Sequence, residues 1–382
     1  MLGQEWRSPP GLRHFFCPQV IAQPRGPLPK CNLQAIPMAD TLGNSMLRTK
    51  RTMLRNAAIT AAFSIAVDVA PLSAAETVAA APTRPISELK PLATIHVGKT
   101  ADWVAVTPDG VWVGSTGPDA AHRIDPKTDK LVATVKLPAE PCAGLATGFG
   151  SLWVPLCSTP STLAKVNLKS NTLSAVLTVG PAGPEGGITA SPDSVWLVVD
   201  KNGSLARIDP DRGTVRQTIQ LPPGSYNPFY MDGQVWVTRA DGAEVTSVDA
   251  HTGAVLGTVK TGPNPRFLSA GTGTVWTLNQ GDGSLTRIDA KTRQVTQTIV
   301  LGTPGHGGDI SIGGGMVWTT MMKVPLSAVG STDSQLRCQW VGGGGDSLGI
   351  GHGAIWLTDY HGGTLSRLGL EDALVHCRKS GA

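Results

Sequence analysis

A short segment centred on Trp recurs seven times in this chain, and this repeat constrains the fold more than any other feature. Aligned on the Trp, the copies read "DGVWVGS", "GSLWVPL", "DSVWLVV", "GQVWVTR", "GTVWTLN", "GMVWTTM" and "GAIWLTD". Their Trp residues follow one another at intervals of 38 to 43 residues and are Trp112, Trp153, Trp196, Trp236, Trp276, Trp318 and Trp356. Self-similarity at a nearly fixed period indicates a repeat architecture in which each copy is one supersecondary unit.

Each unit contains sequence for four short strands. A second signature follows most of the Trp residues and reads "HRIDPKT", "AKVNLKS", "ARIDPDR", "TSVDAHT" and "TRIDAKT". An apolar stretch before the Trp, the Trp segment, the Ile-Asp segment and a β-branched run such as "QVTQTIVL" at 294–301 predict the four strands. The repeated Asp suits the first position of a type I turn, where its carboxylate accepts backbone N–H groups, so we interpret it as a turn residue and not as a metal ligand.

The repeat predicts an all-β fold, a seven-bladed β-propeller of four-stranded antiparallel blades. One such sheet cannot bury both of its faces, whereas seven sheets packed around an axis cover one another and leave short edges. The Trp residues then fill the gaps between neighbouring blades. The last repeat lacks a fourth strand, and "LATIHVGK" at 92–99 resembles one, so we expect an N-terminal strand to close the ring.

The first 75 residues differ in character from the rest of the chain. Arg48, Lys50, Arg51 and Arg55 precede an apolar run from Ala57 to Ala70 and small residues at Ser73 and Ala75, which is the pattern of a secretory signal peptide. A membrane anchor is the alternative, but the run is short and Asp68 interrupts it. We therefore expect a non-native or disordered extension at 1–45, a signal peptide at 46–75, a linker at 76–90, the propeller at 91–375 and a tail at 376–382.

Removal of residues 1–75 changes the charge and the cysteine content. The segment holds eight Lys or Arg and three Asp or Glu, so 24 basic and 25 acidic residues remain, without the basic excess of a nucleic-acid-binding protein. Four Cys remain, which permits two disulfides in an exported chain. Cys142 and Cys157 flank a hairpin whose opposed residues sum to 299, so we expect them to pair. A bridge between Cys338 and Cys377 stays open, and buried free thiols are the alternative for both pairs.

The "G-x-x-W-V" and "L-x-R-I-D-x-x-T" patterns give the chain a resemblance to the YVTN-type and virginiamycin B lyase-like β-propellers over about residues 90–372. The resemblance implies the fold but not the activity, because such propellers host binding, lyase and scaffold functions. The lyases use a magnesium-held Glu-x-His arrangement with a further His as base, and no Glu-x-His occurs in this sequence. Elimination chemistry would require Asp and His from separate loops.

Functional residues of propellers usually lie in the loops before the first strand and after the second strand of each blade, around the mouth of the central channel. The ligand-binding candidates in these loops are Glu185, Tyr226, Arg239, Arg266, His306, Asp309, Tyr360 and His361. Asp102 and Asp346 occupy equivalent positions in the first and seventh blades and are candidates for a divalent-cation site, with solvated loop residues as the alternative. His306, in a Gly-rich loop, is a candidate base or ligand, with an exposed loop His as the alternative.

These observations predict an exported β-propeller that binds a small molecule or a protein partner at the mouth of its channel. The alternative is a metal-assisted lyase or lactone hydrolase that uses the same face, with a divalent cation as its cofactor. We expect a periplasmic or secreted monomer that binds no nucleic acid and has no membrane span after signal cleavage.

Overall fold

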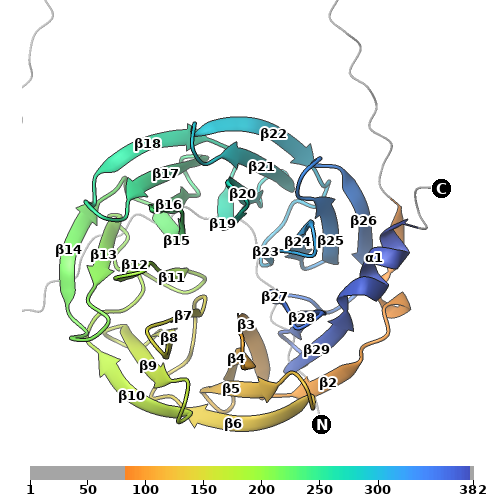
Figure 1. Ribbon diagram of the computed structural model, residues 1–382, viewed down its shortest axis with the longest axis horizontal. Coiled ribbons are helices and arrows are strands. Elements are labelled where there is room, and N and C mark those ends of the chain that lie inside the picture. The colour runs from red at the N-terminus through yellow and green to blue at the C-terminus, as the bar shows by residue number, and fades with distance from the viewer. Residues whose placement is uncertain (1–81, 379–382) are drawn as a thin grey trace, which may run out of the picture. The chain divides into compact units, whose positions relative to one another are not determined.

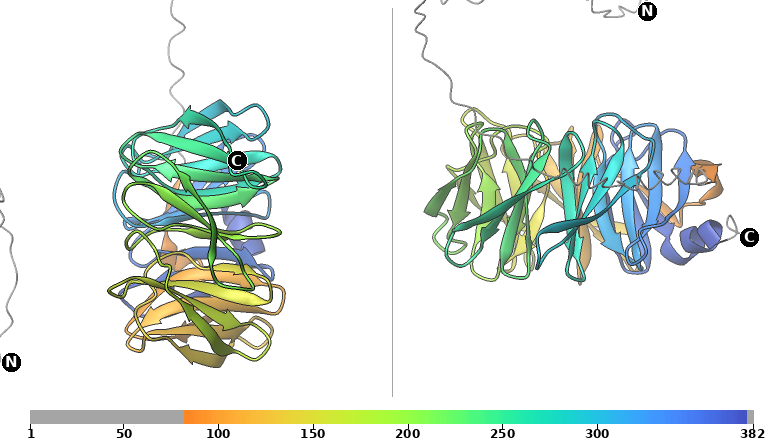
Figure 2. Two further views of the ribbon diagram at one scale, coloured as in Figure 1. Left: turned by 90° about the vertical axis from the view of Figure 1, so that its left-hand side faces the viewer. Right: turned by 90° about the horizontal axis from the view of Figure 1, so that it is seen from above.

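Seven β-sheets surround a central axis in the computed structural model, which describes residues 82–378 (Figure 1). The predicted seven-bladed β-propeller is therefore confirmed. The expected extension at 1–45, the signal peptide at 46–75, the start of the linker and the end of the tail lie outside the described residues. In the side views the strands run between the two faces of the ring, so the loops gather on these faces (Figure 2).

The strands follow the repeat along the chain, four to a blade, and the first strand of each blade is the innermost. Blades 1 to 4 are β3(Thr100–Thr107), β4(Gly110–Thr116), β5(Ala120–Asp125) and β6(Lys130–Lys136); β7(Ala146–Gly148), β8(Ser151–Leu156), β9(Thr162–Asn167) and β10(Thr172–Leu177); β11(Ile188–Ala190), β12(Val195–Val198), β13(Ser204–Ile208) and β14(Val215–Gln220); and β15(Ser225–Met231), β16(Gln234–Arg239), β17(Glu244–Asp249) and β18(Val255–Lys260).

The remaining blades repeat this order with additions from the chain ends. Blades 5 to 7 are β19(Pro265–Gly271), β20(Thr274–Asn279), β21(Ser284–Asp289) and β22(Gln294–Val300); β23(Asp309–Gly313), β24(Met316–Met321), β25(Val324–Gly330) and β26(Leu336–Val341); and β27(Leu348–Gly351), β28(Ala354–Asp359) and β29(Thr364–Gly369), completed by β2(Ala93–His96). The strands within these four-stranded units pair antiparallel, and the second strand of each carries the repeated Trp.

The ring closes where the sequence predicts it. β2 pairs antiparallel with β29, with Ile95 opposite Leu365, and so supplies the fourth strand that blade 7 lacks. The segment 76–90, expected to be a linker, contributes β1(Thr83–Pro85), which pairs parallel with β26, and the 3-10 helix η1(Ile86–Glu88). The N-terminal part of the described chain thus stabilises two adjacent blades.

The seven Trp side chains fill the core between blades, as predicted. All of them are fully buried. Trp112 of blade 1 packs with Leu152 and Val154 of blade 2, and Trp153 of blade 2 packs with Val195 and Leu197 of blade 3. The wedge-shaped gap between diverging sheets explains why a side chain of this volume recurs at one position.

The repeated Asp has the predicted turn role. Asp209 Oδ1 accepts hydrogen bonds from the backbone N–H groups of Asp211 and Arg212, each at 2.9 Å. The hydrogen bond from Arg212 is the largest of the effects that lower the pKa of the Asp209 carboxyl to about 2. Asp249 and Asn167 accept equivalent bonds from the residues that follow them, so the repeated carboxyl or amide terminates the third strand.

Two disulfides join parts of the ring. Cys142 and Cys157 are bonded with their Cα atoms 5.7 Å apart, which confirms the pairing. The strand register from which we predicted this pairing is only partly correct. The sum of 299 holds near the turn, where Ala146 lies opposite Trp153. Residues 143–145 then leave the ladder, and Pro141 lies opposite Leu156, a register shifted by two residues.

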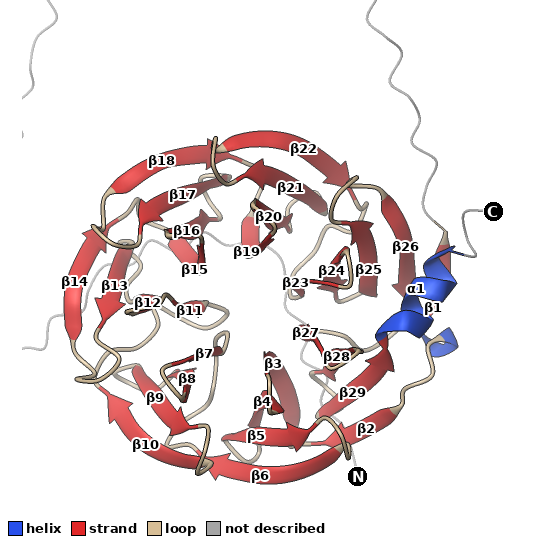
Figure 3. Ribbon diagram, in the orientation of Figure 1, coloured by secondary structure: helices blue, strands red, loops and turns tan. Residues whose placement is uncertain are grey.

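The second disulfide anchors the C-terminal helix. Helix α1(Leu370–Arg378) lies at the outer edge of the ring beside β26 (Figure 3), and its Cys377 is bonded to Cys338 of that strand. Ala373 and Cys377 are buried against the core of blades 6 and 7. Residues 376–378, expected to belong to a tail, are therefore the last part of this helix. Within residues 82–378, no helix has the length and apolar character needed to span a bilayer.

Candidate functional site

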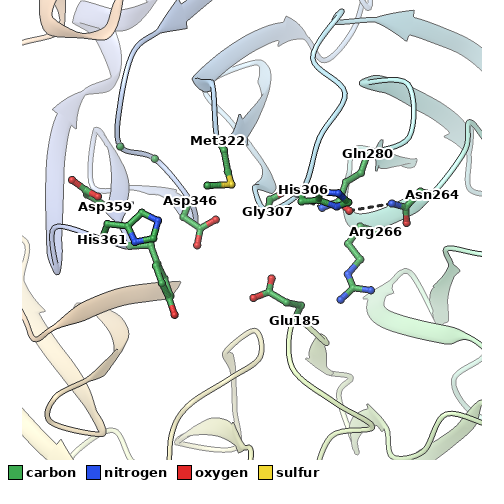
Figure 4. A pocket seen from close by; sticks show the side chains of 13 residues that line it. Glu185, Asn264, Arg266, Gln280, His306, Gly307, Met322, Asp346, Asp359 and His361 are labelled. Atoms are coloured by element: carbon green, nitrogen blue, oxygen red, sulfur yellow. Dashed lines mark hydrogen bonds between the residues drawn. The ribbon is translucent and has the colours of Figure 1, made fainter. Parts of the chain in front are cut away.

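The mouth of the channel holds a cavity of about 550 Å³, which we call the mouth cavity (Figure 4). Loops that precede first strands and loops that follow second strands build its wall. Six of the candidates predicted from the sequence line it: Glu185, Arg266, His306, Asp346, Tyr360 and His361. These residues come from four different blades or the loops before them, so the cavity exists only in the closed ring.

Carboxylates from different blades converge on this cavity. Figure 4 shows the side chains of Glu185, Asp346 and Arg266 directed toward the same space. Asp346 Oδ1 accepts a hydrogen bond of 3.2 Å from the Gly308 N–H. Gly308 has φ of +90°, and a Cβ there would collide with the Thr320 carbonyl, so this approach of the loop to Asp346 requires glycine.

Burial raises the pKa of the carboxyls at the mouth, and neighbouring carboxylates add to this effect at Glu185 and Asp102. Burial is the main cause at Glu185 and Asp346, and at Glu185 the charge of Asp346 acts in the same direction while Arg266 opposes it. The pKa of Asp102 is raised well above its ordinary range, first by burial and then by the charges of Asp346 and Glu185. The surroundings of these carboxyls therefore disfavour their ionised forms in the absence of a further positive charge.

Asp309 lies beside this group, at the start of β23. Its carboxylate accepts hydrogen bonds from Ser347 Oγ at 2.7 Å, from the Ile310 N–H at 2.7 Å and from the Leu348 N–H at 3.2 Å. Burial nevertheless raises its pKa to about 6, since these three bonds offset only part of the desolvation. Asp309 binds its neighbours and does not line the mouth cavity.

Arg266 is held in place by an aromatic ring. Its guanidinium lies over the Tyr226 ring, 3.9 Å from the centroid. The Tyr226 hydroxyl donates to the carbonyl of Pro184, next to Glu185. Tyr226 thus positions Arg266 and the loop of Glu185 together, although it does not itself line the cavity.

The two candidate histidines differ in their surroundings. His361 is exposed and packs edge-on against the Tyr360 ring, with the centroids 5.3 Å apart. His306 is also exposed, in the Gly-rich loop before β23. Burial, followed by the charges of Asp102 and other carboxylates, raises the pKa of the Tyr360 hydroxyl. Both histidines line the mouth cavity and can contact a ligand there.

Arg239 is placed elsewhere. Its Nη1 forms an ion pair with Glu244 at 2.7 Å, and its Nε donates to the Pro223 carbonyl at 2.9 Å. Glu244 also pairs with Lys260 at 2.8 Å. Arg239 is not among the residues that line the mouth cavity.

The candidate metal pair is brought together by ring closure. Burial, followed by the charge of Asp346, raises the pKa of Asp102, so the two carboxyls lie near each other although 244 positions separate them in the sequence. Among residues 82–378, no group of three or more His, Cys, Asp or Glu side chains has the arrangement of a metal site.

Several lining residues were not singled out as candidates from the sequence. They are Asn264, Gln280, Gly307, Met322, Gly344, Gly345 and Asp359. Asn264 Nδ2 donates to Gln280 Oε1 at 3.3 Å, and Gln280 Nε2 donates to the Gly307 carbonyl at 2.9 Å. Their loop positions were the available indication, but apart from Asp359 they are uncharged or glycine residues, whose side chains do not point to a binding site.

Comparison with known proteins identifies the fold and nothing finer. The chain matches no protein-family profile and no curated protein. Of 1568 matching chains of solved structure, one is BamB from Moraxella catarrhalis, with a TM-score of 0.55 and 11% identity over 74% of this chain and 99% of that chain. So widely shared a fold does not select a ligand.

Proposed function

We propose that this chain is an exported binding protein that takes a small amine-bearing molecule in the mouth cavity. The observation that carries the proposal is the charge of the lining. Glu185, Asp346 and Asp359 share the cavity wall with Arg266, which is the only Lys or Arg among the lining residues. A cationic guest supplies the charge that the wall lacks.

The raised carboxyl pKa values support a cationic guest. Burial raises the pKa of both Glu185 and Asp346, and at Glu185 the charge of Asp346 adds to this effect. An ammonium group between them favours their ionised forms and lowers their pKa values. Binding should therefore release protons, and the affinity for the amine should increase as the pH rises through the raised pKa values.

The dimensions of the cavity favour a small molecule over a protein partner. Pockets for small ligands typically enclose about 300 to 1,000 Å³ and combine apolar surface with a few polar groups. The Met322 side chain and the Tyr360 ring supply apolar surface, and Asn264 supplies an amide. These groups suit the carbon skeleton of an organic amine.

Export is the second part of the proposal. Two disulfides suit an oxidising compartment, and residues 46–75 have the pattern of a signal peptide. We place the mature protein in the periplasm or outside the cell, within the YVTN and virginiamycin B lyase-like group that its repeats resemble. A metal-assisted lyase is the second candidate, because His306 and His361 line the same cavity as Asp346.

Calorimetric titration of the mature protein with n-butylamine, and separately with magnesium chloride, tests the proposal. We expect butylamine to bind wild type more tightly at pH 7.5 than at pH 5, and Asp346→Asn and Glu185→Gln to weaken it about tenfold or more. Asp232→Asn is the matched control, because Asp232 is exposed and does not line the mouth cavity. Binding of magnesium alone would favour the lyase, and binding of neither probe would refute both candidates.

A further inference from the structure

A second cavity, of about 360 Å³, lies in the central channel, and we call it the channel cavity. Residues from the loops and first strands of all seven blades line it. Its wall combines apolar side chains, among them Val106, Leu145, Ile312 and Ile350, with polar groups that include Asn227 and Asp309. It adjoins the mouth cavity along the chain, because Gly186 in its wall follows Glu185 in the wall of the mouth cavity.

Trp103 lines the channel cavity and lies within the channel. It belongs to blade 1, yet its ring meets Phe267 of blade 5, with the centroids 6.1 Å apart. Figure 1 shows β3 and β19 on opposite sides of the central opening, so this contact spans the channel. Trp103 is only 5% exposed, and it follows Asp102, whose carboxyl interacts with Asp346 of the mouth cavity.

The backbone of Trp103 adopts a conformation that a bulky residue rarely occupies. Its φ is +57°, at a bulge of β3 between Asp102 and Val104. In the loops before other first strands, left-handed positions are occupied by Asn264 and Gly308, residue types that tolerate this region, and by Glu185, whose side chain is smaller than an indole. A bulky side chain kept in such a conformation points to a functional constraint.

The indole of Trp103 also lacks the hydrogen bond that buried Trp residues usually have. Its Nε1 is buried without a partner, whereas Nε1 of the core residue Trp276 donates to Thr274 Oγ1 at 3.0 Å. Neither its backbone conformation nor its hydrogen bonding explains the presence of Trp at position 103. Its indole instead packs in one buried cluster with Phe267, Leu145 and Ile312, which line the channel cavity, and so occupies space within the channel.

We infer that Trp103 is a specificity-determining residue that limits the length of the ligand by separating the mouth cavity from the channel cavity. This inference rests on the proposed amine-binding function. With Trp103 in place, the carbon chain of a bound amine is confined to the mouth cavity. Without the indole the two cavities join, and a longer chain reaches apolar side chains that line the channel, such as Val106 and Ile350.

A series of straight-chain amines from propylamine to decylamine, titrated into wild type and Trp103→Ala, tests this inference. Affinity for wild type should increase over the shortest members and then stop increasing. Affinity for Trp103→Ala should continue to increase about threefold to fourfold for each added methylene group through the longer members. Trp103→Gly repeats the test if the alanine variant does not fold, because glycine adopts positive φ without strain.

Phe229→Ala is the matched control, because Phe229 lines the channel cavity on β15 but has no ring contact with Trp103 or Phe267. This variant enlarges the channel cavity without removing the indole, so its chain-length profile should match that of wild type. Identical profiles for wild type and Trp103→Ala, or a wild-type profile that rises through decylamine, would overturn the inference and leave amine binding intact. If no amine binds wild type, the proposed function fails and this inference fails with it.

Discussion

Replacing Asp309 by asparagine should change how the stability of the protein depends on pH. Burial raises the pKa of this carboxyl to about 6, above the value of about 3.9 expected in the unfolded chain. The folded state therefore binds more protons between these two pKa values. The stability associated with this proton is fully present below about pH 4 and is lost as the pH rises through about 6.

The magnitude follows from the difference of about two pKa units. At about 1.4 kcal/mol for each unit, integration between pH 4 and pH 7.5 gives a loss of about 2 kcal/mol. The amide introduced by Asp309→Asn does not titrate, so this loss is absent from the variant. The free energy of unfolding of wild type, relative to that of the variant, should decrease by about 2 kcal/mol over this pH range.

Urea unfolding followed by Trp fluorescence, with the disulfides intact, measures this difference at several pH values. The variant also loses acceptor capacity toward Ser347 and Leu348, which adds a cost that does not depend on this titration, so the slope with pH is the diagnostic quantity. Asp289→Asn is the control, because hydrogen bonds from Thr292 lower the pKa of Asp289 and its effect falls mostly below pH 4. A stability difference for Asp309→Asn that stays constant between pH 4 and pH 7.5 would refute a raised pKa at Asp309.

Three further predictions concern the core, the disulfides and the leader. In urea unfolding, Trp276→Phe should destabilise the protein by about 1 kcal/mol more than Trp236→Phe. The reason is that Trp276 Nε1 donates a hydrogen bond to Thr274, whereas the buried Trp236 Nε1 has no partner. Equal losses of stability in the two variants would contradict this prediction. Thiol titration of unreduced, denatured mature protein should find no free thiol, and two free thiols would show that one bridge is missing. Mass spectrometry of exported protein should place its N-terminus near Glu76, and intact residues 1–45 would disprove cleavage there.

The sequence was sufficient to predict the fold because the pattern of one four-stranded blade recurs seven times along the chain. Trp at one position of every unit reports a buried gap between sheets, and Asp209 and its equivalents report a turn. The missing fourth strand of the last unit likewise identified residues 92–99 as the closing segment. Each of these features depends on nearby residues and recurs, so the seven repeats of a single chain can be compared with one another.

The candidate site was less predictable, because it is built from the positions where the repeats differ. Loop counting identified the rim, and the structure brings Asp102 beside Asp346. Arg239 has the right position in its unit, but its guanidinium pairs with Glu244, and charge alone does not reveal that partner. The position of Trp103 in the channel could not be predicted from the sequence. A Trp outside the repeated position has no equivalent in the other units, and its positive φ depends on the folded backbone.

The disulfide between Cys142 and Cys157 was predicted correctly, but the strand register used to predict it holds for only part of the hairpin. Strand register across a two-residue turn predicts Ala146 opposite Trp153, as observed. The ladder is then interrupted, and the resumed pairing places Pro141 opposite Leu156. Cys142 and Cys157 still come within bonding reach because strands at this separation tolerate a diagonal bridge. Interruptions of this kind depend on packing at the channel and are not encoded in alternating hydrophobicity.

A crystal structure of the mature protein with 4-bromobenzylamine tests the central claim most directly, because the bromine can be located by its anomalous signal. We expect the ammonium nitrogen within about 4 Å of the Asp346 and Glu185 carboxylates, the distance of an ion pair, and the bromine on the mouth side of Trp103. An amine bound on the opposite face or at the outer edge of a blade, or an empty mouth cavity at saturating concentration, would contradict it.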